Sequence, residues 1–158
     1  MASRNGSQAR KREDHDTASD LEQLFGYNLK RAYIIFQTDF RKALGPDGLG
    51  PRSFALLALV VRFPNITQSE LARALGIERS GLVAIVDELE GRGYLHRVAV
   101  PGDRRVQALV ATTEGSSAYA DALQRVRDHE TELLADFTDD EKKTLAHLLQ
   151  KIRLREDD

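Results

Sequence analysis

The stretch from Thr67 to Thr113 constrains the fold most, because its pattern changes from helical to alternating within a short length of chain. Thr67 and Glu70 have the spacing of a capping box, and an apolar run follows directly at Leu71, which predicts a short helix. Gly76 supplies the permissive backbone that a sharp turn into a second helix requires. The two helices predict a helix-turn-helix.

The second helix, predicted from about Arg79 to Arg92, has distinct inner and outer faces. At 100° per residue its core face carries Leu82, Ile85, Val86 and Leu89, and its outer face carries Ser80, Ala84, Asp87 and Gly91. A helix-turn-helix reads DNA with the N-terminal part of this helix. Arg79 can reach guanine or phosphate, Ser80 a base or phosphate, and Ala84 a thymine methyl group. The predicted DNA contacts on the two helices are Ser69, Arg79, Ser80, Gly81 and Ala84.

After Gly93 the sequence alternates and is rich in β-branched residues, which predicts a hairpin of Tyr94–Val100 and Val106–Ala111. Pro101, Gly102 and Asp103 form its turn. Arg104 and Arg105 follow at the tip, where two permanent charges suit a narrow minor groove. The segment as a whole predicts a winged helix-turn-helix.

Asp87 needs an explanation, since a carboxylate on a DNA-reading face would be repelled by phosphates. A pair with a wing arginine, Arg105 for preference, would neutralise Asp87 and hold the wing at a fixed angle. The alternative is a solvated acid, because exposed ion pairs contribute little.

These motifs resemble the MarR family of bacterial transcriptional regulators. The matching segments are Val86-Asp87-Glu88-Leu89-Glu90, Asp103-Arg104-Arg105, and Ala111-Thr112-Thr113-Glu114-Gly115 with Ala111 in place of the usual leucine. The resemblance covers residues 20–155 by order of elements, and Gly81 departs from it by standing where relatives often have a hydroxyl residue. It implies an obligate homodimer, a palindromic operator in double-stranded DNA, and often a small ligand between the dimerisation and DNA-binding regions.

The flanking segments are predicted to be helical. Residues 1–18 are polar and charged, typical of a tail. Ser19 and Glu22 predict a cap for a helix to about Leu44, whose buried apolar stripe is broader than one small core demands. A helix to about Phe137 and a last helix capped by Thr138 follow, and the stripe of the last helix lacks a partner within one chain. The stripe of the first helix comprises Leu21, Phe25, Leu29, Ala32, Phe36, Phe40 and Ala43.

The predicted fold is therefore mostly α-helical with a small β-hairpin wing. One domain spans residues 19–158, in which 51–113 form the winged helix-turn-helix and 19–50 and 114–158 form dimerisation helices. These outer helices would interlock with a second chain and place two recognition helices about one DNA turn apart.

A ligand site is predicted where the nearly continuous apolar helix from Pro51 to about Phe63 begins. The helix N-terminus favours an anion and Arg52 adds a charge, so a ligand carboxylate could bind there beside aromatic rings. The alternative is that the aromatic residues belong to the core and Arg52 is solvated. The resembled family commonly recognises phenolic or aromatic carboxylates and sometimes their coenzyme A thioesters. The predicted ligand residues are Tyr27, Tyr33, Phe36, Arg52 and Phe54.

Composition excludes several other functions. The chain has no cysteine, which rules out disulfides, cysteine-ligated zinc and thiol redox sensing, and its four histidines are too scattered for a local metal motif. A net charge of -2 argues against a general nucleic-acid coat protein. The sequence shows no signal peptide or bilayer-spanning run, so we expect a cytoplasmic protein with no membrane partner.

Two functions remain in competition. The first is a homodimeric, ligand-responsive transcriptional repressor. The alternative is a winged-helix module that binds proteins and has no specific affinity for DNA, since fold does not fix function. An enzyme is least favoured, because no nucleophile with a base, Gly-rich phosphate loop or recognisable pair of carboxylates is present, and no cofactor or metal is implied.

Overall fold

The computed structural model describes residues 20–100 and 102–154, with the side chains of residues 103–105 excluded. The predicted tail over residues 1–18 and the predicted cap at Ser19 lie outside this range. The chain divides into two compact units, residues 1–39 and 40–158, and each is described by itself.

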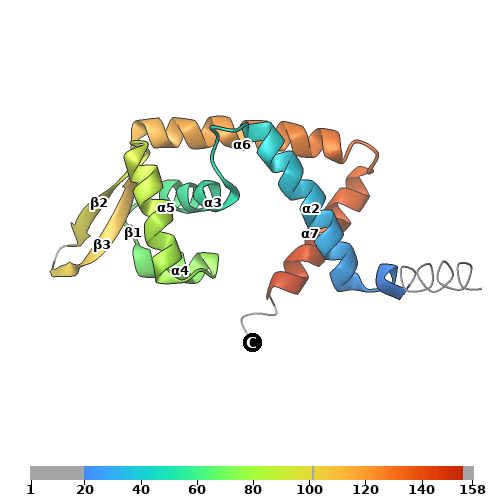
Figure 1. Cartoon of the computed structure of the whole chain (residues 1–158), viewed down its shortest axis with the longest axis horizontal. Helices are drawn as coiled ribbons and strands as arrows, with labels where there is room; N and C mark the ends of the chain where they lie inside the picture. Colours follow the sequence, from blue (N-terminus) through green and yellow to red (C-terminus); the bar gives the residue numbers. More distant parts are fainter. Residues whose placement is uncertain (1–19, 101, 155–158) are drawn as a thin grey trace, which may run out of the picture. The chain divides into compact units, whose positions relative to one another are not determined.

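The elements follow the predicted order, with one short strand added (Figure 1). The first unit holds most of α2, the second its end and all the other elements. No described helix combines the length and apolarity that a bilayer crossing requires. In chain order the elements are α2 (Phe25–Leu44), α3 (Pro51–Arg62), β1 (Ile66–Thr67), α4 (Gln68–Leu75), α5 (Arg79–Gly91), β2 (Leu95–Val100), β3 (Asp103–Ala111), α6 (Thr113–Leu133) and α7 (Asp139–Arg153).

The first predicted helix is interrupted. Residues 20–22 are helical, the chain turns at Gln23, and α2 begins only at Phe25. The Asn28 side chain donates to the Glu22 carbonyl at 2.6 Å and to the Leu24 carbonyl at 3.1 Å. The bond to the Glu22 carbonyl is a side-chain alternative to regular backbone pairing across the break, and the predicted continuous helix is therefore wrong over residues 23–24.

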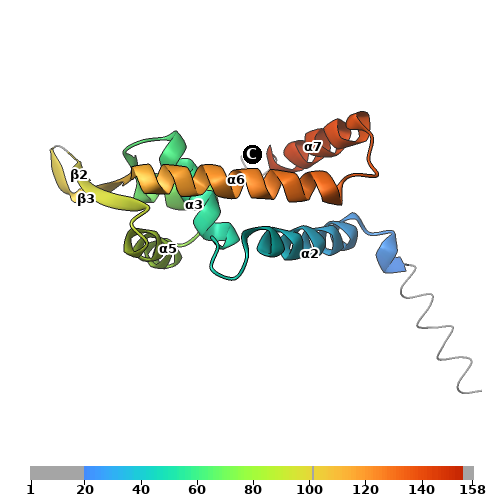
Figure 2. The same ribbon diagram turned by 90° about the horizontal axis from the view of Figure 1, so that it is seen from above.

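The core of the second unit is built around α3, which packs against α4, α5, α6 and β3. Leu56, Leu57 and Val60 on α3 are completely buried, as the nearly continuous apolar sequence of this helix predicts. Figure 2 shows α3 beneath the long α6. The other fully buried large side chains are Leu71, Leu82, Val86, Leu89, Leu95 and Leu109.

Three antiparallel strands form one small sheet in the order β1-β3-β2. Strand β1, which the sequence analysis missed, pairs Ile66 with Leu109 and Thr67 with Ala108. Strands β2 and β3 pair regularly from Leu95 opposite Ala111 to Ala99 opposite Gln107, and then the register shifts so that Val100 lies opposite Asp103. Strand β3 therefore begins at Asp103, earlier than the predicted Val106. Its residues 104–106 have no paired residue on β2 and are extra length on β3.

Local capping explains where the helices begin. Thr67 and Thr138 each form the predicted capping box, with Glu70 and Glu141 respectively. Thr112 starts α6 by accepting from the Gly115 amide at 2.9 Å while its hydroxyl donates to the Gly93 carbonyl at 2.7 Å. The helix ends at Leu133, a turn before the predicted Phe137.

Gly115 is required where α6 passes the start of β2. A Cβ at this position would lie 1.9 Å from the carbonyl oxygen of Tyr94, and that carbonyl already accepts from the Thr112 amide at 3.0 Å. Backbone atoms would have to shift to admit any side chain.

Much of the apolar stripe on the first helix is exposed in the single chain. The predicted burial of Leu21, Phe25 and Leu29 is not reached within the single chain, where 39%, 93% and 46% of their surfaces are exposed. Phe36, Phe40 and Ala43 are half-buried, and only Leu44 at the end of α2 is buried. Helix α7 has no buried residue, although Leu148, Leu149 and Ile152 give it an apolar face.

We predict that Gly115→Ala lowers the free energy of unfolding by about 2–3 kcal/mol, the cost of overpacking against rigid neighbours. Gly91→Ala is the matched control, because that helical glycine has open space around it and alanine favours helix by about 1 kcal/mol. Urea unfolding of both variants measures the difference. A Gly115→Ala protein as stable as the unsubstituted chain would contradict the close approach.

A second prediction concerns acid stability. The hydrogen bonds that Glu70 accepts from the Thr67 hydroxyl and amide lower its pKa from 4.5, and the Thr138 amide and hydroxyl do the same for the pKa of Glu141. A lowered folded-state pKa stabilises the fold above the unfolded value, and this contribution is lost as the pH falls through the folded pKa.

Glu70→Gln combined with Glu141→Gln keeps an acceptor at both caps but removes the charge. We expect this double variant to lose less stability than the unsubstituted chain when urea unfolding is compared at about pH 7 and about pH 3. Identical losses in the two proteins would show that these carboxylates do not contribute.

Candidate nucleic-acid interface

The outward face of α5 is polar, small and open to solvent, as the sequence predicts. Leu82, Val86 and Leu89 are completely buried and Ile85 is half-buried, which fixes the rotation of the helix. The outward residues, all exposed, are Arg79, Ser80, Gly81, Ala84, Asp87 and Gly91. The N-cap residue Glu78 makes no side-chain hydrogen bond to the helix. The N-terminal amides of α5 therefore keep the partial positive charge that attracts phosphate.

Helix α4 and its turn set the position of α5. Thr67 donates its amide to a Glu70 carboxylate oxygen at 2.8 Å, and exposed Ser69 lies in the first turn of α4. Gly76 is left-handed with φ of 60°, which glycine adopts without strain. The Ile77 amide then donates to the Ala72 carbonyl at 3.1 Å and closes the turn between the helices.

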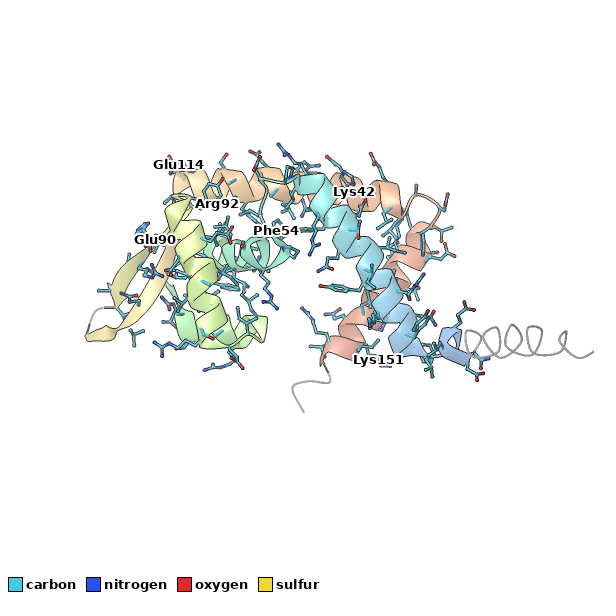
Figure 3. All side chains as sticks on the ribbon, in the orientation of Figure 1. Lys42, Phe54, Glu90, Arg92, Glu114 and Lys151 are labelled. Carbon is cyan, nitrogen blue, oxygen red and sulfur yellow. The ribbon has the colours of Figure 1, made fainter. Side chains whose placement is uncertain are left out.

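Arg97 on β2 binds two carboxylates of α5. One guanidinium nitrogen donates to Asp87, the other to Glu90, and the Arg97 amide donates to Glu90 at 3.2 Å. Only 23% of the Arg97 side chain is exposed, against 60% for Asp87 and 35% for Glu90. This three-residue cluster, called the Arg97 clamp below, fixes the hairpin to the recognition helix, and Figure 3 labels Glu90 on the hairpin side of α5.

Sequence reasoning missed Arg97, although a signal was present. Alternation along β2 places Arg97 on the same face as Leu95, which is buried with 1% exposed. Asp87 and Glu90 are three residues apart and so lie on one side of α5. An arginine on the inward face of a strand next to such a pair indicates an ion pair across the elements.

Comparisons with known proteins agree with this geometry. A sequence model of the MarR family matches residues 47–106. The chain is 30% identical over 152 residues to a protein of Thauera aromatica named for transcriptional regulation of the hcr operon, covering 90% of this chain and 92% of the relative. The chain belongs to the MarR family of transcriptional regulators. Its winged helix is thus the DNA-binding fold of that family.

Solved structures of CouR are also similar to this MarR chain. One structure holds the transcriptional repressor CouR bound to a 23-mer DNA duplex. Its sequence is 37% identical to this chain, and the TM-score is 0.81 over 85% of this chain and 95% of CouR. CouR bound to p-coumaroyl-CoA is 35% identical, with a TM-score of 0.76 over 85% and 94% of the two chains.

At the tip of the wing of this MarR protein, the structure describes the backbone of residues 103–105 but not their side chains. Arg104 and Arg105 lie in the part of β3 where the register shifts, so they belong to the extra length of that strand. Their side chains lie outside the described ones, and the Asp87–Arg105 pair stays a prediction. Arg97 already neutralises Asp87, which removes the like-charge repulsion from DNA that prompted that pairing.

The predicted ligand residues are divided between the two units. Tyr27, Tyr33 and Phe36 belong to the first unit, where the Tyr33 hydroxyl accepts from Gln37 Nε2 at 3.2 Å. Arg52 is exposed in the second unit, and the Phe54 ring packs there against two aromatic rings. The structure does not test whether the five meet, so this ligand site stays a prediction. The rings beside Phe54 are those of Phe40 and Tyr119, each with its centroid 5.5 Å away.

We predict that the Arg97 clamp contributes unequally through its two carboxylates. The half-buried Glu90 loses more solvent screening than Asp87, so Glu90 should show a coupling to Arg97 of about 1 kcal/mol and Asp87 about half as much. Double-mutant cycles with Arg97→Gln, Glu90→Gln and Asp87→Asn in urea unfolding measure both.

The Asp140–Lys143 pair on α7 is the control cycle, because 95% and 78% of these side chains are exposed at an N···O distance of 3.7 Å. An exposed pair of this kind should show almost no coupling. Equal coupling in all three cycles would mean that the clamp is no stronger than an ordinary surface pair.

Proposed function

We propose that this MarR-family chain is a homodimeric repressor that binds a palindromic operator and is released from it by a small ligand, an aromatic carboxylate or its coenzyme A thioester. The observation that carries the proposal is the outward face of α5, which is exposed, small and held at a fixed rotation by its buried side. The similarity to a repressor bound to duplex DNA supports the same assignment.

On DNA, α5 would enter the major groove and the wing would reach the adjacent minor groove. Arg79 and Ser80 at the helix N-terminus would contact bases or phosphates, and Ala84 would contact a thymine methyl group. Ser69 on α4 and Gly81, whose lack of a side chain allows close approach, would lie against the backbone. Arg104 and Arg105 would supply the charge in the minor groove.

Exposed apolar faces support the homodimer. Phe25, Tyr33 and Ile35 on α2 are 93%, 59% and 56% exposed, and Leu148 and Ile152 on α7 are 50% and 57% exposed. Large apolar side chains exposed on a helix in this number are typical of a protein interface. A second copy bound to these helices would give the two-fold symmetry that matches a palindromic site.

The effector class rests on two observations. CouR, a similar structure, is bound to p-coumaroyl-CoA, and an exposed Arg52 stands in the first turn of α3, two residues before the aromatic residue Phe54. A carboxylate or phosphate group would be attracted to this helix end and its added charge. Release then requires that the ligand bind the DNA-free conformation more tightly than the DNA-bound one.

The experiment is selection of duplexes from a random pool, followed by anisotropy binding to the enriched sequence and a scrambled one over a salt series. We expect Arg79→Ala to weaken binding to the enriched sequence about tenfold, the usual loss for a base contact. Arg104→Ala should make the salt slope shallower by about 0.9 if one phosphate contact is lost.

Arg62→Ala is the matched control, since it removes the same charge from the far end of α3, where Arg62 stacks on Phe63. Enrichment of no sequence, or equal and weak binding to both duplexes, would favour the protein-binding module instead. p-Coumaroyl-CoA, p-coumarate and coenzyme A are then added separately to the complex. If none of them lowers DNA affinity, the proposed effector class is wrong even if specific DNA binding stands.

A further inference from the structure

A chain of hydrogen bonds joins the last turn of α5 to two other parts of the second unit. The Ser53 hydroxyl on α3 donates to Glu88 Oε2 at 2.8 Å, and Glu88 Oε1 lies 3.1 Å from Arg92 Nη2. Arg92 Nη1 in turn donates to the backbone carbonyl of Asp47 at 3.1 Å. These four groups, called the Arg92 strap below, are separate from the Arg97 clamp on the hairpin side.

Each end of the strap lies on a closely packed part of the second unit. Ser53 is buried, with 4% exposed, on the helix that forms the centre of the core. Asp47 lies in the loop of residues 45–50, in which Leu49, like Leu44 just before the loop, is only 7% exposed. Within that loop a Cβ on Gly48 would be 2.3 Å from the Leu44 carbonyl oxygen, so its backbone is closely packed.

We propose that Glu88 and Arg92 are positioning residues that set the angle at which α5 presents its N-terminal end to DNA. This inference rests on the proposed function. Helix α5 has 13 residues and is therefore about 20 Å long. A tilt of about 10° at its C-terminal end moves Arg79 by about 3 Å, which is the whole length of a hydrogen bond.

The strap also connects α5 with the segment that follows α2. Residues 45–50 are the covalent link from α2 to α3, and Asp47 is the point at which Arg92 holds this link. A displacement of the loop therefore reaches α5 through the guanidinium group rather than through the apolar core alone. Figure 3 labels Arg92 at the end of α5.

Simpler roles for Arg92 can be separated from this one by a single substitution. Arg92 could act only as a cation at a helix C-terminus, as half of an ordinary exposed i,i+4 pair, or as a phosphate contact. Lysine preserves the charge needed for all three. Its single nitrogen cannot bind Glu88 and the Asp47 carbonyl in the forked geometry of arginine, so only the link from Glu88 to Asp47 is lost.

The test compares Arg92→Lys and Ser53→Ala with the unsubstituted chain, using the duplex enriched by selection and a scrambled duplex. Arg125→Lys is the matched control, because Arg125 lines the same cavity of about 210 Å³ as Arg92 but is not part of the strap. We expect both strap variants to bind the enriched duplex about fivefold more weakly, the loss of about one hydrogen bond. Binding to the scrambled duplex, the salt slope and the control should be unchanged.

Hydrogen exchange of the DNA-free proteins gives a second readout. Arg92→Lys should raise exchange in residues 88–94 and 45–50 and leave β2 unchanged, since β2 is held by the Arg97 clamp. Unchanged exchange or unchanged affinity in Arg92→Lys would overturn the proposal. An equal loss on both duplexes with a shallower salt slope would identify Arg92 as a phosphate contact and would overturn it as well.

The two proposals fail in different ways. If the unsubstituted chain enriches no sequence, the proposed function fails and Glu88 and Arg92 cannot be positioning residues for DNA reading. If the unsubstituted chain enriches a sequence that the strap variants bind equally well, the proposed function stands and only the strap is rejected.

Discussion

The packing of α5 against α3 is the interaction on which the DNA-binding region depends. Leu82, Val86 and Leu89 lose all contact with water on one side of the helix, and burial of each such side chain contributes about 1.5–3 kcal/mol. That contribution fixes the rotation of α5 about its own axis. The opposite side can then consist of small and polar residues that add little to stability and remain free to contact DNA.

Fixing the rotation of α5 does not fix its tilt, and polar contacts limit the tilt. Apolar side chains pack without strong directional preference, so α5 could still tilt on the core. The Arg97 clamp ties the C-terminal half of α5 to the hairpin, and Glu88 and Arg92 connect its last turn to α3 and to the preceding loop. Each cluster uses the forked guanidinium of arginine, which binds two acceptors in a defined geometry.

Local signals in the sequence predicted most of the helices and their faces. The capping boxes at Thr67 and Thr138, the turn at Gly76 and the buried stripe of α5 depend on residues a few positions apart, and the structure confirms all of them. The exposed face of α5 was predictable for the same reason, and the DNA contacts expected on it stay a prediction.

Features that depend on distant residues were not predicted. Strand β1 is two residues long and exists because β3 pairs with it, so no local pattern indicates it. The partner of Asp87 was expected on the wing tip, whereas Arg97 is the described partner, since the choice between arginines depends on how the hairpin lies on α5. The stripe of α2 indicates burial, yet 93% of Phe25 is exposed in the single chain, because burial depends on neighbours that a local pattern does not specify.

Because the register of the hairpin shifts, the attachment of the wing to the sheet and the length of its tip depend on different residues. Five regular pairs, from Leu95 opposite Ala111 to Ala99 opposite Gln107, hold its base to the sheet, while residues 104–106 are extra length on one strand only. An insertion or deletion among these three residues would change the length of the tip and leave every one of those pairs intact. The reach of the wing can therefore diverge among related proteins without any change in the scaffold that supports it.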